Sequence, residues 1–150
     1  MKKLFSLLVL LPITMTCFSQ VENPISWTFS AKRIDATTYE VHLTAKMEDG
    51  WHIYSQTTPE GGPVPTEIIF NKNPLLILDG NIKEIGKLEQ RLEVLFGVDV
   101  KQFSGKVDFV QVIKRKVSAK TNITGNIKFM TCNDEMCLPP KSLPFTISVQ

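Results

Sequence analysis

The sequence has few residues that bind metal ions and no marked excess of either charge. It contains two histidines and three cysteines, with 17 basic and 15 acidic side chains in 150 residues. Binding to nucleic acid or to an anionic membrane surface needs a basic patch, so this balance argues against both functions. His42 and His52 fall in separate predicted strands and give no zinc-ligand spacing with the cysteines. A Gly-rich phosphate loop is absent too, so we expect no metal ion and no small-molecule cofactor.

Long apolar runs are also absent, except at the amino terminus. Two lysines precede the apolar segment 4–16, which is too short to span a bilayer. Small residues follow it, which fits cleavage by signal peptidase after Ser19. We expect residues 1–19 to be a signal peptide and residues 20–150 to form one mature domain. That domain is expected to be exported to the periplasm and to have no membrane span.

Cys17 leaves an alternative open. A lipid-acceptor cysteine directly after the apolar segment would make the protein a surface lipoprotein. Residues 14–16 contain none of the small Gly, Ala or Ser residues that lipoprotein processing usually requires, which favours loss of Cys17 with the signal peptide. The mature domain would then keep Cys132 and Cys137, an even number that suits an oxidising compartment.

Alternating apolar and polar residues predict an all-β fold. The alternation is clearest in segments 39–45, 127–131 and 143–149, and turn sequences such as Asp49-Gly50 separate the segments. No segment has a convincing helical period, although 82–94 comes nearest to one. About eight short strands in one domain are typical of an immunoglobulin-like β-sandwich. The weaker strand candidates are 25–32, 51–55, 66–70, 75–78 and 106–112.

The two remaining cysteines are separated by four residues, Asn133-Asp134-Glu135-Met136, and can form a disulfide if this loop curls back. Closing so short a loop removes only about 2 kcal/mol of unfolded-state entropy, so the bond is a weak staple. Asp134 and Glu135 disfavour a thiolate, which suits a pair that another protein's thiolate attacks. A structural staple and a reversible redox pair both remain compatible with these residues.

Three segments together resemble a known family. They are Gly-Trp-His-Ile-Tyr-Ser at 50–55, Gly-Gly-Pro-Val-Pro-Thr at 61–66 and the ending Cys-Asn-Asp-Glu-Met-Cys-Leu-Pro-Pro at 132–140. In this order they resemble the amino-terminal periplasmic domain of DsbD, the transmembrane thiol:disulfide interchange protein, also called protein-disulfide reductase. The resemblance covers essentially the whole mature chain and implies an immunoglobulin-like sandwich with a redox cysteine pair near one edge.

The resemblance also implies a function and a set of site residues. The family domain takes electrons from a thioredoxin-like domain and hands them to periplasmic substrates, including disulfide isomerases and cytochrome c maturation factors. By this likeness Cys137 is the cysteine attacked in the mixed disulfide, and Cys132 resolves it. A cap loop shields the pair in the family. Here it corresponds to residues 93–97, with Phe96 as the candidate shield beside Leu95 and Glu93; an ordinary core aromatic is the alternative for Phe96.

This chain departs from the family pattern in several ways. It has one residue fewer between the cysteines, and Glu93 is followed by Val94 where the family has adjacent acidic residues. The 150 residues include no transmembrane electron conduit and no thioredoxin-like domain, so both would come from separate chains. His52, Trp51 and Tyr54 are interpreted as packing residues, and lining of the redox site is the alternative for Trp51 and Tyr54. A non-enzymatic envelope adaptor with a permanent disulfide is the alternative to thiol:disulfide exchange.

Overall fold

The computed structural model describes residues 23–150, and regular structure in this part of the chain is entirely β. The expected signal peptide and Cys17 lie outside the described residues. Within residues 23–150 there is no helix long and apolar enough to cross a membrane. The strands are β1 (Ile25–Arg33), β2 (Thr38–Met47), β3 (His52–Tyr54), β4 (Glu67–Phe70), β5 (Leu76–Glu93), β6 (Val98–Arg115), β7 (Thr121–Cys132) and β8 (Cys137–Val149).

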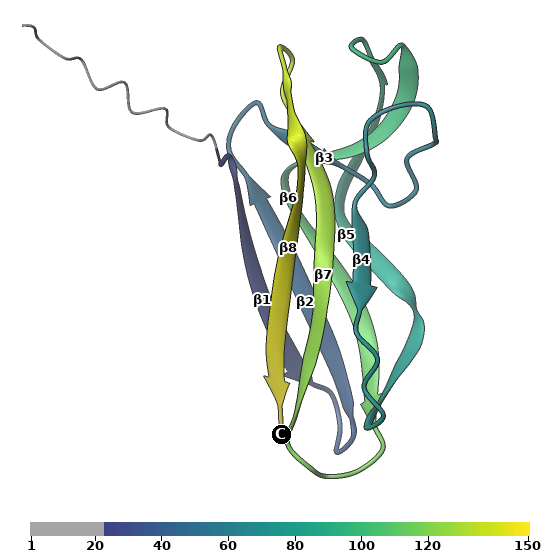
Figure 1. Ribbon diagram of the computed structural model, residues 1–150, viewed down its shortest axis with the longest axis vertical. Coiled ribbons are helices and arrows are strands. Elements are labelled where there is room, and N and C mark those ends of the chain that lie inside the picture. Colours follow the sequence, from purple (N-terminus) through teal and green to yellow (C-terminus); the bar gives the residue numbers. More distant parts are fainter. Residues whose placement is uncertain (1–22) are drawn as a thin grey trace, which may run out of the picture.

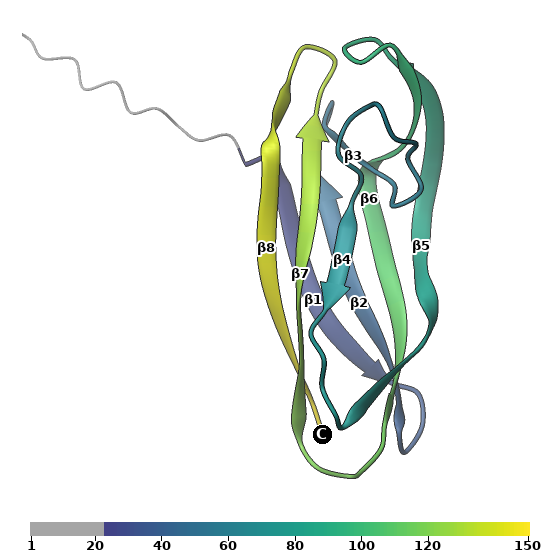
Figure 2. The same cartoon turned by 45° about the vertical axis from the view of Figure 1, so that its right-hand side comes forward.

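The strands form an antiparallel sandwich of the expected immunoglobulin-like type (Figures 1 and 2). One layer has the order β1-β2-β6-β5, and the other has the order β4-β7-β8. The short strand β3 pairs with both β6 and β7, and it thereby joins the two layers into one curled sheet. The β5–β6 and β7–β8 hairpins reach the same end of the sandwich, as both views show.

Alternation of apolar residues along the strands explains the main core. Tyr39, Val41, Leu43 and Ala45 of β2 are buried, whereas the residues between them are partly exposed. The ends of β7 and β8 show the same period of two, so the expected strands 39–45, 127–131 and 143–149 are confirmed. Aromatic rings fill the space between the layers: the ring of Trp27 lies 5.9 Å from that of Phe109 and 5.3 Å from that of Phe129.

Segment 82–94, which came nearest to a helical period, lies in the long strand β5 up to Glu93, where the strand ends. Its pairing with β6 shifts register twice, between Asp79 and Lys83 and between Gly86 and Leu88. Each irregularity interrupts the alternation of faces, so the apolar residues do not recur at every second position. β5 also lies at a sheet edge and leaves much of its length exposed, which removes the apolar signal of a half-buried strand.

Gly125 of β7 lies where β4, β7 and β8 approach one another closely. A Cβ atom there would overlap the carbonyl oxygen of Ile69 and lie 2.5 Å from Cζ of Phe145. We expect Gly125→Ala to lower the free energy of unfolding by about 1–3 kcal/mol, because overpacking forces the neighbouring strands apart. Urea denaturation measures the change. Lys128→Ala, at an exposed position of the same strand, is the control; equal stability of the two variants would contradict the prediction.

Candidate redox site

The two cysteines face each other at the turn end of the β7–β8 hairpin. Cys132 is the last residue of β7 and Cys137 the first of β8; they are register partners with Cα atoms 4.1 Å apart, and their sulfurs form a disulfide. Asn133 builds the turn between them. Its side-chain oxygen accepts hydrogen bonds from the backbone N–H groups of Glu135 at 2.9 Å and Met136 at 2.8 Å. Hydrogen bonds within the turn thus place the cysteines opposite each other independently of the sulfur–sulfur bond.

The two sulfur-bearing residues differ in exposure. Cys132 is 0% exposed, whereas Cys137 is partly exposed and follows the exposed Met136. The turn residues Asp134 and Glu135 are exposed as well. The disulfide is therefore more accessible from the side of Cys137 than from that of Cys132.

A second apolar cluster surrounds Cys132, on the opposite face of β3 from the main core. Ile53 of β3 packs into the main core, while its neighbour Tyr54 belongs to the second cluster, because successive side chains of a strand point to opposite faces. We call this second group the cysteine cluster. It consists of Tyr54, Val100 and Cys132, with Val98, Met130 and Cys137 packed against them.

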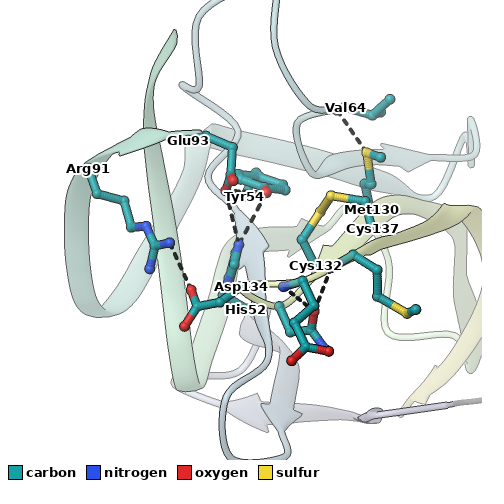
Figure 3. Close-up of a disulfide and its surroundings, with 12 residues drawn as sticks. His52, Tyr54, Val64, Arg91, Glu93, Met130, Cys132, Asp134 and Cys137 are labelled. Atoms are coloured by element: carbon teal, nitrogen blue, oxygen red, sulfur yellow. Dashed lines mark hydrogen bonds and ion pairs between the residues drawn. A yellow bond between two sulfur atoms is a disulfide. The ribbon is translucent and has the colours of Figure 1, made fainter. Parts of the chain in front are cut away.

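A buried hydrogen-bond network adjoins the cysteine cluster (Figure 3). The Tyr54 hydroxyl donates to Oε2 of Glu93 at 3.0 Å, and Nε2 of His52 lies 3.1 Å from the Tyr54 oxygen and 3.5 Å from the same Oε2. All three side chains are buried. The single hydroxyl proton of Tyr54 goes to Glu93, so the hydrogen between His52 and Tyr54 must belong to Nε2 of His52. His52 is thus the tautomer with a bare Nδ1.

The network holds His52 and Tyr54 in their neutral forms at neutral pH. Burial lowers the pKa of His52 below its usual 6.5; the nearby Glu93 opposes this shift, and Arg91 adds to it. Burial, followed by the hydrogen bond to Glu93, raises the pKa of Tyr54 well above its usual range. The site therefore offers a neutral imidazole as a base and no phenolate.

An ion pair joins the two hairpins at this end of the molecule. Nη2 of Arg91, on β5, lies 2.9 Å from Oδ1 of Asp134 in the β7–β8 turn. The pair raises the pKa of Arg91 and lowers that of Asp134. Because both side chains are substantially exposed, the pair adds little to global stability. Its effect is local, since it ties the turn between the cysteines to the strand that carries Glu93.

The three residues expected in the cap loop lie in two different settings. Glu93 is buried at the end of β5 and joins the network beside the cysteine cluster. Leu95 and Phe96 lie at the tip of the β5–β6 hairpin, where the backbone N–H groups of Phe96 and Gly97 donate to the carbonyl of Glu93. Phe96 is 37% exposed and lies outside the main core. Its role as a shield stays a prediction.

The sequence favours packing roles for His52 and Tyr54, with lining of the redox site as the alternative for Tyr54. Trp51 packs against the main core as expected. A histidine and a tyrosine two positions apart on one strand share a face, which is a weak local signal of a polar pair. Their third partner, Glu93, is 39 residues from Tyr54 in the chain, and no local pattern connects them. Within residues 23–150, no group of three or more His, Cys, Asp or Glu side chains is placed to hold a metal ion.

Residues 20–148 match the sequence profile of the family described as thiol:disulfide interchange protein DsbD, N-terminal. The chain belongs to this family. Membership confirms the resemblance that the cysteine ending and the two upstream segments indicated. No curated protein sequence matches the chain significantly.

Two solved structures support the same fold. The N-terminal periplasmic domain of ScsB from Proteus mirabilis is 16% identical, with a TM-score of 0.52; the match covers 83% of this chain and 44% of that one. The DsbD N-terminal domain of Neisseria meningitidis in its reduced form is 16% identical, with a TM-score of 0.52, over 76% of this chain and 86% of that one. This chain therefore spans less than half the length of the ScsB structure that it matches.

His52 makes stability depend on pH. Its pKa is lower in the folded protein than in the unfolded chain, so its contribution is complete above pH 6.5 and is lost as the pH falls toward the folded value. We expect the free energy of unfolding to fall below pH 6.5 by up to about 1.4 kcal/mol per pH unit from this group. Urea denaturation between pH 5 and 8 measures the slope.

His52→Gln should remove this slope, and His42→Gln, which changes the exposed-face histidine of β2, should retain it. The pKa of Asp35 is lowered to about 2, and the pKa of Asp134 is lowered from 3.8. These carboxylates therefore affect stability only at more acidic pH. An unchanged slope between pH 5 and 6.5 in His52→Gln would contradict the assignment.

Proposed function

We propose that the domain is a periplasmic thiol:disulfide exchange module whose Cys132–Cys137 disulfide opens and closes as it passes reducing equivalents. A thioredoxin-like redox domain supplies the electrons, and disulfide-bearing envelope proteins, including those that serve cytochrome c maturation, receive them. Membership of the DsbD N-terminal family supports the reaction class. The observation that carries the proposal is the unequal exposure of the two cysteines at the end of a hairpin.

The position of the disulfide does not suit a structural staple. β7 and β8 already pair from Thr121 and Val149 up to Phe129 and Lys141, so the bond links strands that backbone hydrogen bonds hold together. The loop that it closes is short, and its entropic contribution is about 2 kcal/mol. The bond can therefore open without releasing either strand from the sandwich, which a redox-cycling pair requires.

The exposure difference supports a separate role for each cysteine. A partner thiolate attacks Sγ of Cys137, forms a mixed disulfide with it and displaces Cys132 as the leaving group. The partner's second thiol then attacks the sulfur of the partner's first cysteine in the mixed disulfide and releases Cys137. The partner dithiol is oxidised to a disulfide, and this domain gains two electrons and two protons as two thiols. The same steps run in reverse when the dithiol reduces a substrate.

The partners follow from this reaction. Each half of the cycle needs a protein with two redox-active cysteines, and the turn that it approaches carries Asp134 and Glu135 beside the apolar Met136. The thioredoxin-like donor and a membrane conduit that recharges it belong, in this proposal, to separate chains. The proposal also includes cleavage of the signal peptide after Ser19 and export of the mature domain to the periplasm.

Single-cysteine variants test the roles. With oxidised glutathione as the probe, we expect Cys132→Ser to form a glutathione adduct at the partly exposed Cys137, and Cys137→Ser to form little adduct at the buried Cys132. Both variants should stay folded, with about 2 kcal/mol lower stability in urea. Mass spectrometry of the intact proteins measures the adducts. Equal adduct formation in the two variants would contradict the assigned order of attack, and unfolding of both would indicate a structural bond.

The reduction potential separates exchange from permanent bonding. In glutathione redox buffers, we expect the pair to have a potential well above about −300 mV, in the range of labile disulfides. A bond that survives excess reduced glutathione, with a potential below that value, would instead indicate an envelope adaptor with a structural disulfide.

The cap loop is tested by truncation of its exposed side chains. If Phe96 and Leu95 cover the pair, Phe96→Ala and Leu95→Ala should each make oxidation of the dithiol by hydrogen peroxide severalfold faster, because apolar cover is lost. Loss of free thiol with time measures the rate. Val117→Ala is the matched control, since Val117 is similarly exposed in the β6–β7 loop at the opposite end of the sandwich. Rates equal to the control would refute the shielding role.

A further inference from the structure

One row of residues crosses the sheet at its redox end. Ser104 of β6 is the register partner of His52, His52 is also the partner of Cys132, and Cys132 is the partner of Cys137. Side chains directly opposite in antiparallel strands point to the same face, with Cβ atoms about 4.5–5.5 Å apart. His52 and the buried cysteine are thus immediate neighbours across β3 and β7.

The hydrogen-bond network leaves one nitrogen of the His52 ring without a partner in it. Nε2 is occupied as a donor to Tyr54 and lies 3.5 Å from Glu93, which leaves the bare Nδ1 as the only basic atom of the ring. The network holds the ring at Nε2, through Tyr54 and Glu93 (Figure 3). A neutral imidazole held in this way can accept a proton transiently, because Glu93 offsets part of the cost that burial places on the imidazolium.

Cys132 needs a proton acceptor when it acts in the proposed exchange. To resolve a mixed disulfide at Cys137, its thiol must become a thiolate, and burial in an apolar cluster opposes this ionisation. The other titratable groups near Cys132 are not suited to accept its thiol proton. Tyr54 keeps its phenolic proton, Arg91 cannot act as a base, and Asp134 is exposed and paired with Arg91.

The remaining walls of the site are uncharged. β6 contributes Val98 and Val100, β7 contributes Met130, and the loop before β4 contributes Val64, whose N–H contacts Sδ of Met130 at 3.4 Å. Two further carboxyl groups lie near the cysteines. Glu135 is exposed in the turn, and Oε2 of Glu93 already accepts the Tyr54 hydroxyl. Among the described residues, His52 is therefore the base placed beside Cys132.

We propose that Nδ1 of His52 accepts the Cys132 thiol proton in the resolving step, and that Tyr54 and Glu93 position the ring for it. This role rests on the proposed exchange function and deepens it. As Sγ of Cys132 attacks Sγ of Cys137, its proton moves to Nδ1, the Cys132–Cys137 bond forms, and the bond from Cys137 to the substrate sulfur breaks. The substrate leaves as a thiolate and is reduced by two electrons. The proton passes from His52 to that thiolate or to water, which restores the neutral ring.

The reaction of the reduced domain with 5,5′-dithiobis(2-nitrobenzoate) separates the two steps. Cys137 releases the first thionitrobenzoate when it forms the mixed disulfide, and Cys132 releases the second when it resolves it. Stopped-flow absorbance records both phases. We expect His52→Gln to leave the first phase unchanged and to slow the second by about 100-fold near neutral pH, in the range of general base catalysis. The lost rate should return as the pH is raised, because hydroxide then removes the thiol proton.

Two further variants complete the design. His42→Gln should leave both phases unchanged, because His42 lies on β2, away from the cysteines, and pairs with Asp108 at 2.7 Å. Tyr54→Phe should slow the second phase less than His52→Gln, because it removes the group that fixes the ring but keeps the base. A second phase of normal rate and normal pH profile in His52→Gln would overturn the proposal.

The wild-type protein supplies a readout that does not depend on a folded variant. Proton–nitrogen NMR of the His52 ring, titrated with pH in the disulfide and dithiol forms, should give two different midpoints, because a thiol beside Nδ1 replaces the disulfide sulfur. Identical titrations in both forms would overturn the proposal. Absence of any reaction between the wild-type dithiol and the reagent would instead count against the exchange function itself.

Discussion

The pairing of β3 with both β6 and β7 is the constraint on which the site depends. The three residues of β3 join the two layers of the sandwich, and their side chains point to two opposite faces at its end. Ile53 closes the main core on one face, while His52 and Tyr54 line the other. Without this strand, Cys132 would end β7 at an open edge with no wall beside it. The redox chemistry is thus built outside the main core, where a change of bonding does not disturb the packing that keeps the domain folded.

The site combines three requirements that oppose one another. A redox disulfide must be reachable, its resolving cysteine must be protected, and a buried thiol must still be able to lose its proton. The hairpin end meets the first through Cys137, and the cysteine cluster meets the second around Cys132. In the proposed exchange, the His52–Tyr54–Glu93 network meets the third with groups from β3 and β5. The groups involved come from β3, β5, β6, β7 and β8, so the arrangement exists only in the folded sandwich.

The sequence predicted the parts of this structure that local pattern controls. Strands 39–45, 127–131 and 143–149 alternate because one face is buried, and the cysteines lie opposite each other because they flank a short turn. The sequence failed for β5, where two register shifts break the alternation, and for the network. Glu93 reaches Tyr54 only because β5 pairs with β6 beyond the second shift. This contact depends on tertiary geometry that neither the periodicity of 82–94 nor the motif at 50–55 contains.

The two irregularities in β5 have a consequence for how the protein behaves among its own copies. β5 is a long edge strand, and its exposed face carries Ile85, Leu88 and Leu92, a combination that invites strand addition and aggregation. A second strand docking along this edge would need an uninterrupted ladder of hydrogen-bonding groups. The shifts between Asp79 and Lys83 and between Gly86 and Leu88 bend the edge and break that ladder into short pieces. The two register shifts interrupt the alternation by which a strand is predicted from sequence. They also protect the domain against fibril-like self-assembly with its own copies.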